Sequence, residues 1–391
     1  MIELEKAIRL ALNHPVSSGT ETIPLEQATG RVLAEEIIAD HDVPAFSRAT
    51  MDGYACRRED LPGPLLVLET VEAGKVPENR LLRNQCCKIM TGAMVPEGAD
   101  CVIMKEYVET DGDGRIRFTA DKTEDYIDPR GQHLKKGELL LSKGTRITPR
   151  HTGIIASTGK MAVNVHRMLK IGILSTGSEL VEPHLEPLGA QIRNSNSHQL
   201  AAQTENAGHH PILLGIVKDQ RDALMEKIEE ALGRVDLLMT TGGASVGELD
   251  LVPGVFKELG FMLAFDRVAM QPGKPVCFAH RNGRVCFGLS GNPVSSFVQF
   301  EMLVRPYLEA CMEEHPVNRR IQIRFEMEYR RKRTDRQFFL PVFITENGSC
   351  APVEYHGSGH LHALHQAIGF AEIPAGQTEI KKGEFVHVRL I

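Results

Sequence analysis

The feature that most limits the possible folds of this chain is an alternation of apolar runs with helix-like segments between residues 169 and 312. The apolar runs read KIGILST, PILLGIV, VDLLMTT, PVCFAH and RVCFGL, and each has the length of a β-strand. Segments with helical periodicity lie at about residues 195–208, 219–232, 251–259 and 293–312. Strands that are apolar on both faces are typical of a sheet covered by helices on both sides. The pattern therefore predicts a doubly wound α/β domain with a parallel sheet at residues 167–313.

The regions before and after this domain have a different character. Residues 1–45 and 125–166 are predicted to form a helical and linker domain, which begins with an amphipathic helix at about residues 2–14. Residues 46–124 carry short β-branched runs divided by Gly and Pro, which indicates an inserted β-rich domain. Residues 317–391 read as strands separated by Gly, Pro and Asn, and they predict a small C-terminal β domain near the lower size limit for independent folding.

Composition argues against several classes of function. The net charge is −6, Trp is absent and aromatic residues make up 5% of the chain, so we do not expect nucleic acid as a partner. The eight cysteines include no C-x-x-C pair, which disfavours a zinc cluster and fits the reducing cytoplasm. The N-terminal helix is too polar for a signal peptide or a membrane span. We expect a cytoplasmic protein that does not enter a membrane.

Three glycine-containing turns follow predicted strands of the α/β domain. They read STGSEL (175–180), TTGGASVGELD (240–250) and LSGNPVSS (289–296). In a parallel α/β sheet, ligands bind beyond the carboxyl ends of the strands, where glycine lets the backbone come close and N–H groups attract anions. One such turn is as consistent with ordinary turn chemistry, but three in one domain favour a binding cleft. Neither a Walker A sequence nor a G-x-G-x-x-G motif occurs in the chain.

Charged residues accompany these turns. Glu179, Asp219 and Asp250 lie at or just after predicted strand ends. Carboxylates beside an anion site repel the ligand unless a cation bridges them, and Mg²⁺ binds one or two carboxylates together with phosphate oxygens. For each acid, capping of a neighbouring helix is an equally good interpretation. Lys274 lies in the rigid turn QPGKP and is either an oxyanion contact or an ordinary surface lysine.

Taken together, the motifs resemble those of one enzyme family. STGSEL, RNSNS, TTGGASVGELD, QPGKP and LSGNPVSS resemble the MoeA family of molybdopterin molybdenumtransferases, which is similar to the E domain of gephyrin. The segments FSRATMDGYA and IMTGAMVPEGADCVIMKE resemble two signatures of the first part of that family, and GSGHLHAL is a weaker match. The resemblance covers nearly the whole chain and implies that the central domain is MogA-like.

The resemblance implies that the protein inserts molybdate into adenylylated molybdopterin with Mg²⁺, releasing AMP and molybdenum cofactor. It implies a homodimer with an intersubunit active site, in which Asp52 and Thr91 reach into the partner's cleft, and a molybdopterin adenylyltransferase as a possible partner. The implied catalytic residues are Asp52, Thr91, Glu179, Asp219, Asp250 and Lys274, with Asp219 and Asp250 as Mg²⁺ ligands. The residues implied to bind substrate are Thr176, Gly177, Ser178, Thr241, Gly242, Gly243, Ser245, Pro275, Gly291, Asn292, Pro293 and Ser295.

The sequence also departs from the family pattern. Many members of the family have the sequence LPGNP, and here Ser290 replaces its first proline, which is expected to loosen a rigid turn. The sequence KPGKP is also frequent, and here Gln271 replaces its first lysine and removes one cation. His360, His362 and His365 are interpreted as surface histidines, two of them on one β face, rather than as a metal site.

These departures keep alternatives open. One is a molybdopterin-binding carrier or scaffold protein with reduced transfer activity, and another is an adenylyltransferase. The sequence begins directly with a helix at Met1, which favours a stand-alone enzyme over a gephyrin-like scaffold.

Overall fold

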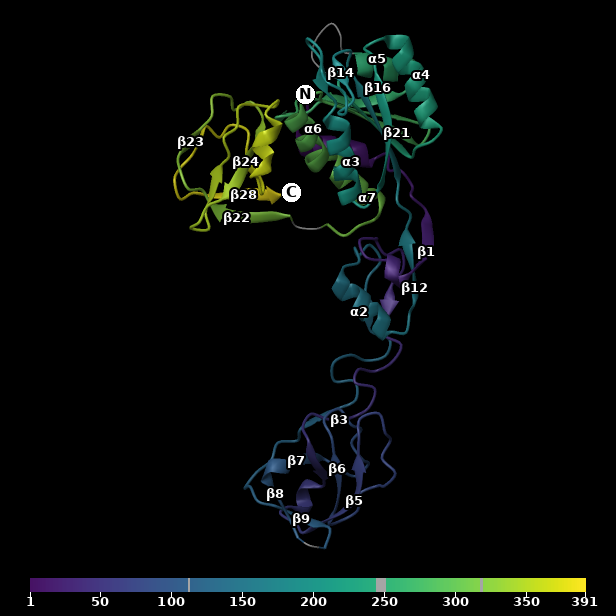
Figure 1. Ribbon diagram of the computed structural model, residues 1–391, viewed down its shortest axis with the longest axis vertical. Helices are drawn as coiled ribbons and strands as arrows, with labels where there is room; N and C mark the ends of the chain where they lie inside the picture. Colours follow the sequence, from purple (N-terminus) through teal and green to yellow (C-terminus); the bar gives the residue numbers. More distant parts are fainter. Residues whose placement is uncertain (112, 244–250, 317–318) are drawn as a thin grey trace. The chain divides into compact units, whose positions relative to one another are not determined.

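The computed structural model describes residues 1–111, 113–243, 251–316 and 319–391 (Figure 1). The chain divides into two compact units. One contains residues 1–35, 143–148 and 162–391, and the other contains residues 36–142 and 149–161. Of the helices in the described ranges, none combines the length and the apolar character needed to cross a membrane.

The central sheet of the first unit has the strand order β16-β13-β17-β21-β20-β18. Its strands are β13 (Lys170–Thr176), β16 (His210–Val217), β17 (Leu237–Thr241), β18 (Met262–Arg267), β20 (Pro275–Arg281) and β21 (Arg284–Leu289). β16, β13, β17 and β21 run parallel, as the apolar runs predict. β20 and β18 run antiparallel to their neighbours, so the sheet is mixed at one edge.

A two-residue hairpin between β20 and β21 explains this reversal. Asn282 and Gly283 have φ angles of 49° and 77°, as in the tight turns that join antiparallel strands. Because β20 runs in the opposite direction to β21, its first residue, Pro275, lies at the edge where the parallel strands end. The turn QPGKP therefore reaches the same edge of the sheet as the glycine-containing turns, although it precedes a strand.

Helices cover both faces of the sheet, which confirms the α/β class. On one face, buried side chains of α1 (Leu4–Leu12), α3 (Asn196–Asn206), α6 (Pro293–Gln299), the π-helical segment η4 (Phe300–Val304) and α7 (Arg305–Cys311) share a core with the strands. On the other face lie α4 (Arg221–Leu232) and α5 (Leu251–Glu258) (Figure 1). The N-terminal helix α1, predicted as part of a separate helical and linker domain, thus packs on the central domain through Ala7 and Ala11. The long helix predicted at about residues 293–312 is interrupted by the π-helical segment.

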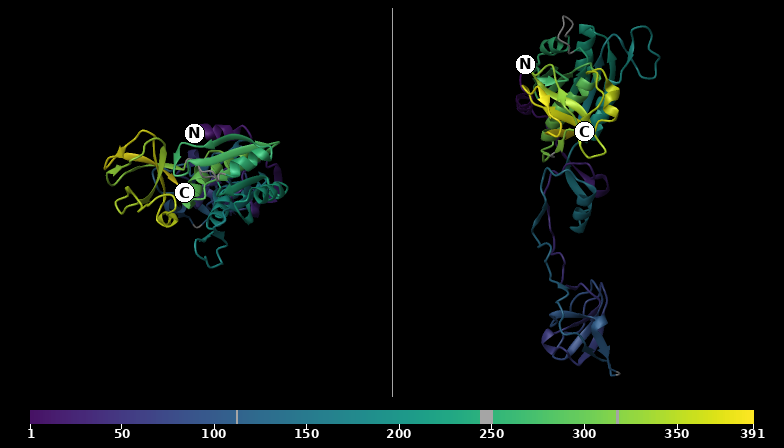
Figure 2. Two further views of the ribbon diagram at one scale, coloured as in Figure 1. Left: turned by 90° about the horizontal axis from the view of Figure 1, so that it is seen from above. Right: turned by 90° about the vertical axis from the view of Figure 1, so that its left-hand side faces the viewer.

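The strands of the C-terminal region, yellow-green to yellow in Figure 2, form a sheet with β19 of the central domain in the order β19-β24-β26-β28-β22. These are β19 (Met270–Gln271), β22 (Arg320–Arg324), β24 (Gln337–Ile344), β26 (Gly369–Ile373) and β28 (Phe385–Leu390), and β25 (Cys350–Pro352) pairs with β24. A ribbon of β23 (Tyr329–Arg330) and β27 (Glu379–Ile380) and the 3-10 helix η5 (Leu361–His365) complete this region. Because β19 directly precedes Pro272, the turn QPGKP joins the C-terminal sheet to the central sheet.

The second unit is β-rich. Its main sheet has the order β7-β4-β6-β5-β9-β8, with β4 (Gly53–Cys56), β5 (Leu65–Val71), β6 (Gln85–Ile89), β7 (Cys101–Met104), β8 (Val108–Thr110) and β9 (Arg115–Phe118). It also contains the pairs β3 (Arg48–Ala49) with β10 (Ile127–Asp128) and β2 (Ile37–Ile38) with β11 (Leu139–Leu141), and the helix α2 (Pro149–Ser157).

Two short strand pairs complete the first unit. β1 (Thr20–Pro24) pairs with β12 (Ala162–His166), and β14 (Leu180–Val181) pairs with β15 (Ile192–Arg193).

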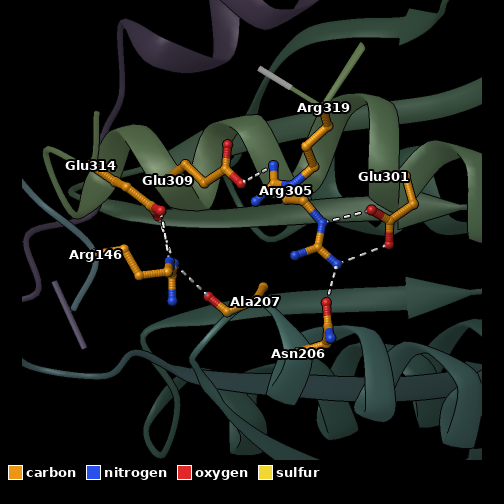
Figure 3. A network of polar contacts seen from close by, with 8 residues as sticks. All are labelled: Arg146, Asn206, Ala207, Glu301, Arg305, Glu309, Glu314 and Arg319. Atoms are coloured by element: carbon orange, nitrogen blue, oxygen red, sulfur yellow. Dashed lines mark hydrogen bonds and ion pairs between the residues drawn. The ribbon is translucent and has the colours of Figure 1, made fainter. Parts of the chain in front are cut away.

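A network of buried ion pairs lies beside α3 and α7 in the first unit (Figure 3). Arg146 binds Glu314 in a bidentate pair, with Nε–Oε1 and Nη2–Oε2 distances of 2.7 and 2.6 Å. Arg305 Nε donates to Glu301 Oε2 at 2.6 Å, and Arg305 Nη2 donates to Asn206 Oδ1 at 3.1 Å. Arg146 Nη2 also donates to the carbonyl oxygen of Ala207 at 3.1 Å. The network thus connects the segment 143–148 and α7 to the end of α3, and it stabilises the packing of segments that are distant in sequence.

Candidate functional site

A cleft of about 950 Å³ lies at the carboxyl edge of the parallel strands. The three predicted turns meet there, together with Pro275 and with Leu361 and His362 of the C-terminal region. The predicted site residues that line it are Thr176, Glu179, Asp219, Thr241, Gly242, Gly243, Pro275, Gly291, Asn292 and Pro293. The prediction that these turns form one cleft is thus correct for the described residues.

Other predicted residues lie elsewhere or outside the described ranges. Of the described residues expected to contact substrate, Gly177, Ser178, Lys274 and Ser295 do not line this cleft. Ser295 is buried in α6 with 3% of its surface exposed, and the other three belong to turns whose neighbouring residues line the cleft. Ser245 and Asp250 lie outside the described residues.

Asp219 is held by the turn that follows β13. Its Oδ1 accepts a hydrogen bond from the hydroxyl of Thr176 at 2.7 Å, and its Oδ2 accepts one from the backbone N–H of Ser178 at 3.3 Å. The next helix, α4, begins at Arg221 after the cap residue Gln220. The interpretation of Asp219 as a helix cap is therefore wrong, and its carboxylate belongs to the cleft.

Glycine is required where the turn after β17 passes the turn after β13. Gly242 has a φ of 96°, in the left-handed region that other residues rarely adopt. A Cβ atom at this position would lie 2.0 Å from the carbonyl oxygen of Thr176. Only glycine lets the two backbones approach this closely, and both turns line the cleft.

Two buried asparagines of the RNSNS motif connect the turns. Asn196 Nδ2 donates to Thr241 Oγ1 and to the carbonyl oxygen of Gly291, both at 2.9 Å. Asn194 Oδ1 accepts a hydrogen bond from Ser175 Oγ at 2.9 Å. These residues line the cleft but were not singled out from the sequence. The available signal was the pair of asparagines at the start of a predicted helix, because Asn side chains there often bind nearby backbone groups.

The second unit holds a separate cluster around Asp52. Its Oδ1 accepts hydrogen bonds from the backbone N–H of Thr91 at 2.9 Å and from the Thr91 hydroxyl at 2.8 Å. Its Oδ2 accepts one from Lys105 Nζ at 3.2 Å. The two Thr91 bonds, followed by the Lys105 bond, lower the pKa of the Asp52 carboxyl to about 2. Asp52 and Thr91, which the resemblance implies as catalytic residues, are thus in contact with each other, and Lys105 is a member of the cluster that sequence reasoning missed.

Family models match almost the whole chain. Residues 2–159 match the MoeA N-terminal region (domain I and II), residues 172–310 match the probable molybdopterin binding domain, and residues 326–391 match the MoeA C-terminal region (domain IV). A molybdopterin molybdenumtransferase of Bacillus subtilis is 36% identical over 406 residues, covering 100% of this chain and 94% of that protein. The chain belongs to the MoeA family.

Other MoeA relatives agree over the same length. A molybdopterin molybdenumtransferase of Staphylococcus epidermidis is 34% identical, covering 100% of this chain and 95% of that protein. Two solved structures of MoeA proteins from Pyrococcus horikoshii are similar to this chain with TM-scores of 0.83 and 0.86 at 33% and 30% identity. Each comparison covers 100% of this chain, and 99% and 100% of the solved chains.

The C-terminal region contributes a histidine to the cleft of this MoeA protein. His362 lines the cleft from η5, so the expectation that two of the three histidines lie on one β face is wrong for this residue and for His365. His362 and His365 are exposed, and His360 is partly buried with its ring stacked on that of His356 at 5.0 Å. Two of the three are surface side chains, as expected, but one of these faces the cleft.

The carboxylates of the cleft fit a hard divalent cation. Glu179 and Asp219 both line it, and carboxylate oxygens are ligands that Mg²⁺ prefers. Within the described residues, no group of three or more His, Cys, Asp or Glu side chains is placed to hold a metal ion by itself. A Mg²⁺ ion here would therefore take further ligands from water or from a bound phosphate.

Proposed function

We propose that this protein is a molybdopterin molybdenumtransferase that inserts molybdate into adenylylated molybdopterin and releases AMP. The observation that carries the proposal is the cleft in which three glycine-containing turns meet the carboxylates of Glu179 and Asp219. Relatives of the same length and family bear the name of this activity, which supports the assignment. The protein is expected to work in the cytoplasm.

The cleft has the chemistry to bind the two anionic parts of such a substrate. Backbone N–H groups of the glycine-containing turns offer neutral donors to phosphate oxygens. The hydroxyl protons of Thr176 and Thr241 are already donated to Asp219 and to the carbonyl oxygen of Ser290, so these side chains shape the cleft. Molybdate is a tetrahedral dianion, and transfer requires the dithiolene sulfurs of molybdopterin to bind molybdenum while oxide leaves. The replacement of oxide by sulfur on molybdenum needs little covalent chemistry from the protein. Positioning and charge compensation therefore carry most of the rate.

We assign Mg²⁺ to Asp219 and Asp250, with Glu179 beside it. A Mg²⁺ ion bound there would act as a Lewis acid on the pyrophosphate of the adenylylated substrate. The hydroxyl of Thr176 and the N–H of Ser178 hold the Asp219 carboxylate in place, so the protein keeps one anionic ligand oriented toward the cleft. Lys274, in the adjoining turn, is assigned to the molybdate oxyanion.

We further propose a homodimer in which Asp52 and Thr91 of one subunit complete the cleft of the other. The support is the resemblance of MDGYA and MTGAMVP to family signatures, and the fixed geometry of the Asp52 carboxylate. The cluster offers a carboxylate that stays ionised and a lysine ammonium, which suit a polar ligand. A molybdopterin adenylyltransferase is the expected partner because its product is the substrate proposed here.

The test is to incubate the purified protein with adenylylated molybdopterin, molybdate and Mg²⁺, and to measure AMP. We expect AMP release that depends on molybdate. Asp219→Asn should lower the rate by about a hundredfold or more, since it removes one negative charge from the proposed ion site while keeping a similar shape. Asp222→Asn, an exposed acid in the first turn of α4, is the matched control and should behave as wild type.

Two outcomes would contradict the proposal. Tight binding of adenylylated molybdopterin without AMP release would favour the alternative, a carrier or scaffold with reduced transfer activity. Equal rates for wild type and Asp219→Asn, with the same dependence on Mg²⁺, would remove Asp219 from the ion site even if the protein is a transferase.

A further inference from the structure

The side chain of Gln299 bridges two turns that line the cleft. It is fully buried at the end of α6. Its Nε2 donates to the carbonyl oxygen of Gly273 at 2.9 Å and to that of Pro275 at 2.7 Å. Its Oε1 accepts a hydrogen bond from the backbone N–H of Ser290 at 2.8 Å. One amide therefore binds the QPGKP turn at the residues before and after Lys274, and it also binds the LSGNPVSS turn at Ser290.

The contacts fix the orientation of this amide. Both Nε2 hydrogens are used by carbonyl acceptors, and Oε1 faces an N–H donor. Turning the amide over would place its oxygen against two carbonyl oxygens and its nitrogen against an N–H, which is unfavourable on every contact. Gln299 thus has one arrangement, and that arrangement determines how far apart the two turns lie.

The turn at Ser290 is held by Gln299. The sequence comparison expected a serine at this position to loosen the turn. In the structure, Ser290 is buried, its N–H is bound by Gln299, and its hydroxyl accepts a hydrogen bond from the N–H of Asn292 at 3.2 Å. A buried N–H left without its acceptor is destabilising, so the bond to Gln299 restrains the turn.

The packing on the other side is equally close. Gly273 has a φ of 104°, and a Cβ atom there would lie 3.0 Å from Gln299 Cγ. The backbone at this glycine therefore rests directly on the glutamine side chain. A shift of Gln299 would move the turn that carries Lys274 and Pro275.

We propose that Gln299 is a positioning residue for the substrate cleft, which holds the QPGKP turn at a fixed distance from Ser290 and Gly291. Pro275, Ser290 and Gly291 all line the cleft, while Gln299 itself does not. The residue acts on the ligand only through these two turns. The effect on molybdate use rests on the proposed function, whereas the effect on the turns does not.

The experiment compares two substitutions that break different parts of the contact. Gln299→Met keeps the length of the side chain but loses every hydrogen bond. Gln299→Glu keeps the acceptor for Ser290 and offers at most one donor to Gly273 and Pro275. Gln203→Met is the matched control, because Gln203 is also buried and its Nε2 bonds Phe297 and Glu301, away from the QPGKP turn.

Hydrogen exchange of the Ser290 amide and the molybdate dependence of AMP release are measured for each variant. Gln299→Met should speed exchange at Ser290 by about tenfold, and Gln299→Glu should leave this exchange slow. Both variants should raise the half-saturating molybdate concentration about tenfold or more, with a smaller change in the maximal rate. Gln203→Met should lower the melting temperature but change the exchange and the molybdate curve by less than about twofold.

The results separate the two proposals. If Gln299→Met and Gln203→Met have the same molybdate curve and the same Ser290 exchange, Gln299 is merely a structural residue and the inference is wrong. If the wild type shows no molybdate-dependent AMP release, the proposed function fails. The exchange at Ser290 then still decides whether Gln299 restrains the turns.

Discussion

Two clusters of charged residues in this protein use the same chemistry in opposite environments. In the first unit, the Glu314 carboxylate that binds Arg146 is 1% exposed, and the Arg305–Glu301 pair is also buried. In the second unit, Asp52 and Lys105 are 39% and 57% exposed. Burial removes the water that competes for a charge, so the first cluster is coupled to folding. The second keeps its charges accessible to a ligand.

The largest difference is expected when Arg146 is replaced. Arg146→Met leaves the Glu314 carboxylate buried without its guanidinium partner, and the free energy of unfolding should fall by about 3–5 kcal/mol. Lys143→Met removes the neighbouring exposed pair with Glu313, whose side chains are 49% and 59% exposed, and should cost at most about 1 kcal/mol. Urea denaturation of both variants measures the contrast. Equal losses would show that burial does not distinguish these pairs.

A second expected effect is acid sensitivity near the buried network. His209 is 4% exposed, its Nδ1 accepts a hydrogen bond from the N–H of Leu169, and no partner among the described residues binds its Nε2. Burial, followed by the charges of Arg146, Arg305 and Arg31, lowers the His209 pKa to about 4.

The sign follows from the neutral folded form of this histidine. Above pH 6.5 His209 is neutral in both the folded and the unfolded state, so it does not lower the free energy of unfolding. As the pH falls from 6.5 to about 4, the unfolded state gains a proton that the folded state excludes, and stability should drop by about 3 kcal/mol. His209→Asn should flatten this dependence, whereas His387→Asn, at an exposed histidine, should keep it. A slope unchanged in His209→Asn would rule out His209 as its source.

The smallest effect on stability is expected at Asp52. Asp52→Asn keeps an oxygen for the Thr91 donors, and the site is exposed, so the midpoint of urea denaturation should change little. If the proposed intersubunit role is correct, AMP release should still fall about tenfold or more, because the charge toward the ligand is lost. Asp121→Asn, an exposed acid of the same unit, is the control. Unchanged AMP release in Asp52→Asn would place the cluster outside the reaction.

Sequence reasoning recovered the parts of the fold that depend on local pattern. Apolar runs such as residues 170–176 and 237–241 formed parallel strands, because a strand with nearly all of its side chains buried is stable only between two layers. It missed the reversal of β20, although Asn282–Gly283 carried the hairpin signal. It also missed that α1 joins the core of the central domain, since periodicity shows which face is apolar but not what covers it.

The residues of the candidate site also fall into a group that the sequence predicted and a group that it did not. The glycine-containing turns and the acid Asp219 were visible in the sequence because turn chemistry and strand ends are local features. Asn194, Asn196 and Lys105 were missed because their roles depend on partners far along the chain, such as Gly291 for Asn196 and Asp52 for Lys105. A hydrogen bond of this kind leaves no periodic trace in a sequence.

By itself, the sequence determined the α/β class, the order of the main strands and helices, and the turns that carry the ligand chemistry, since each follows from residue types within a few positions. Only the tertiary structure decided which turns meet, that QPGKP reaches the cleft through the antiparallel β20, and that Gln299 binds two of these turns. The physical reason is that a fully buried polar group must find a partner wherever the fold places one. That partner is set by packing rather than by sequence neighbourhood.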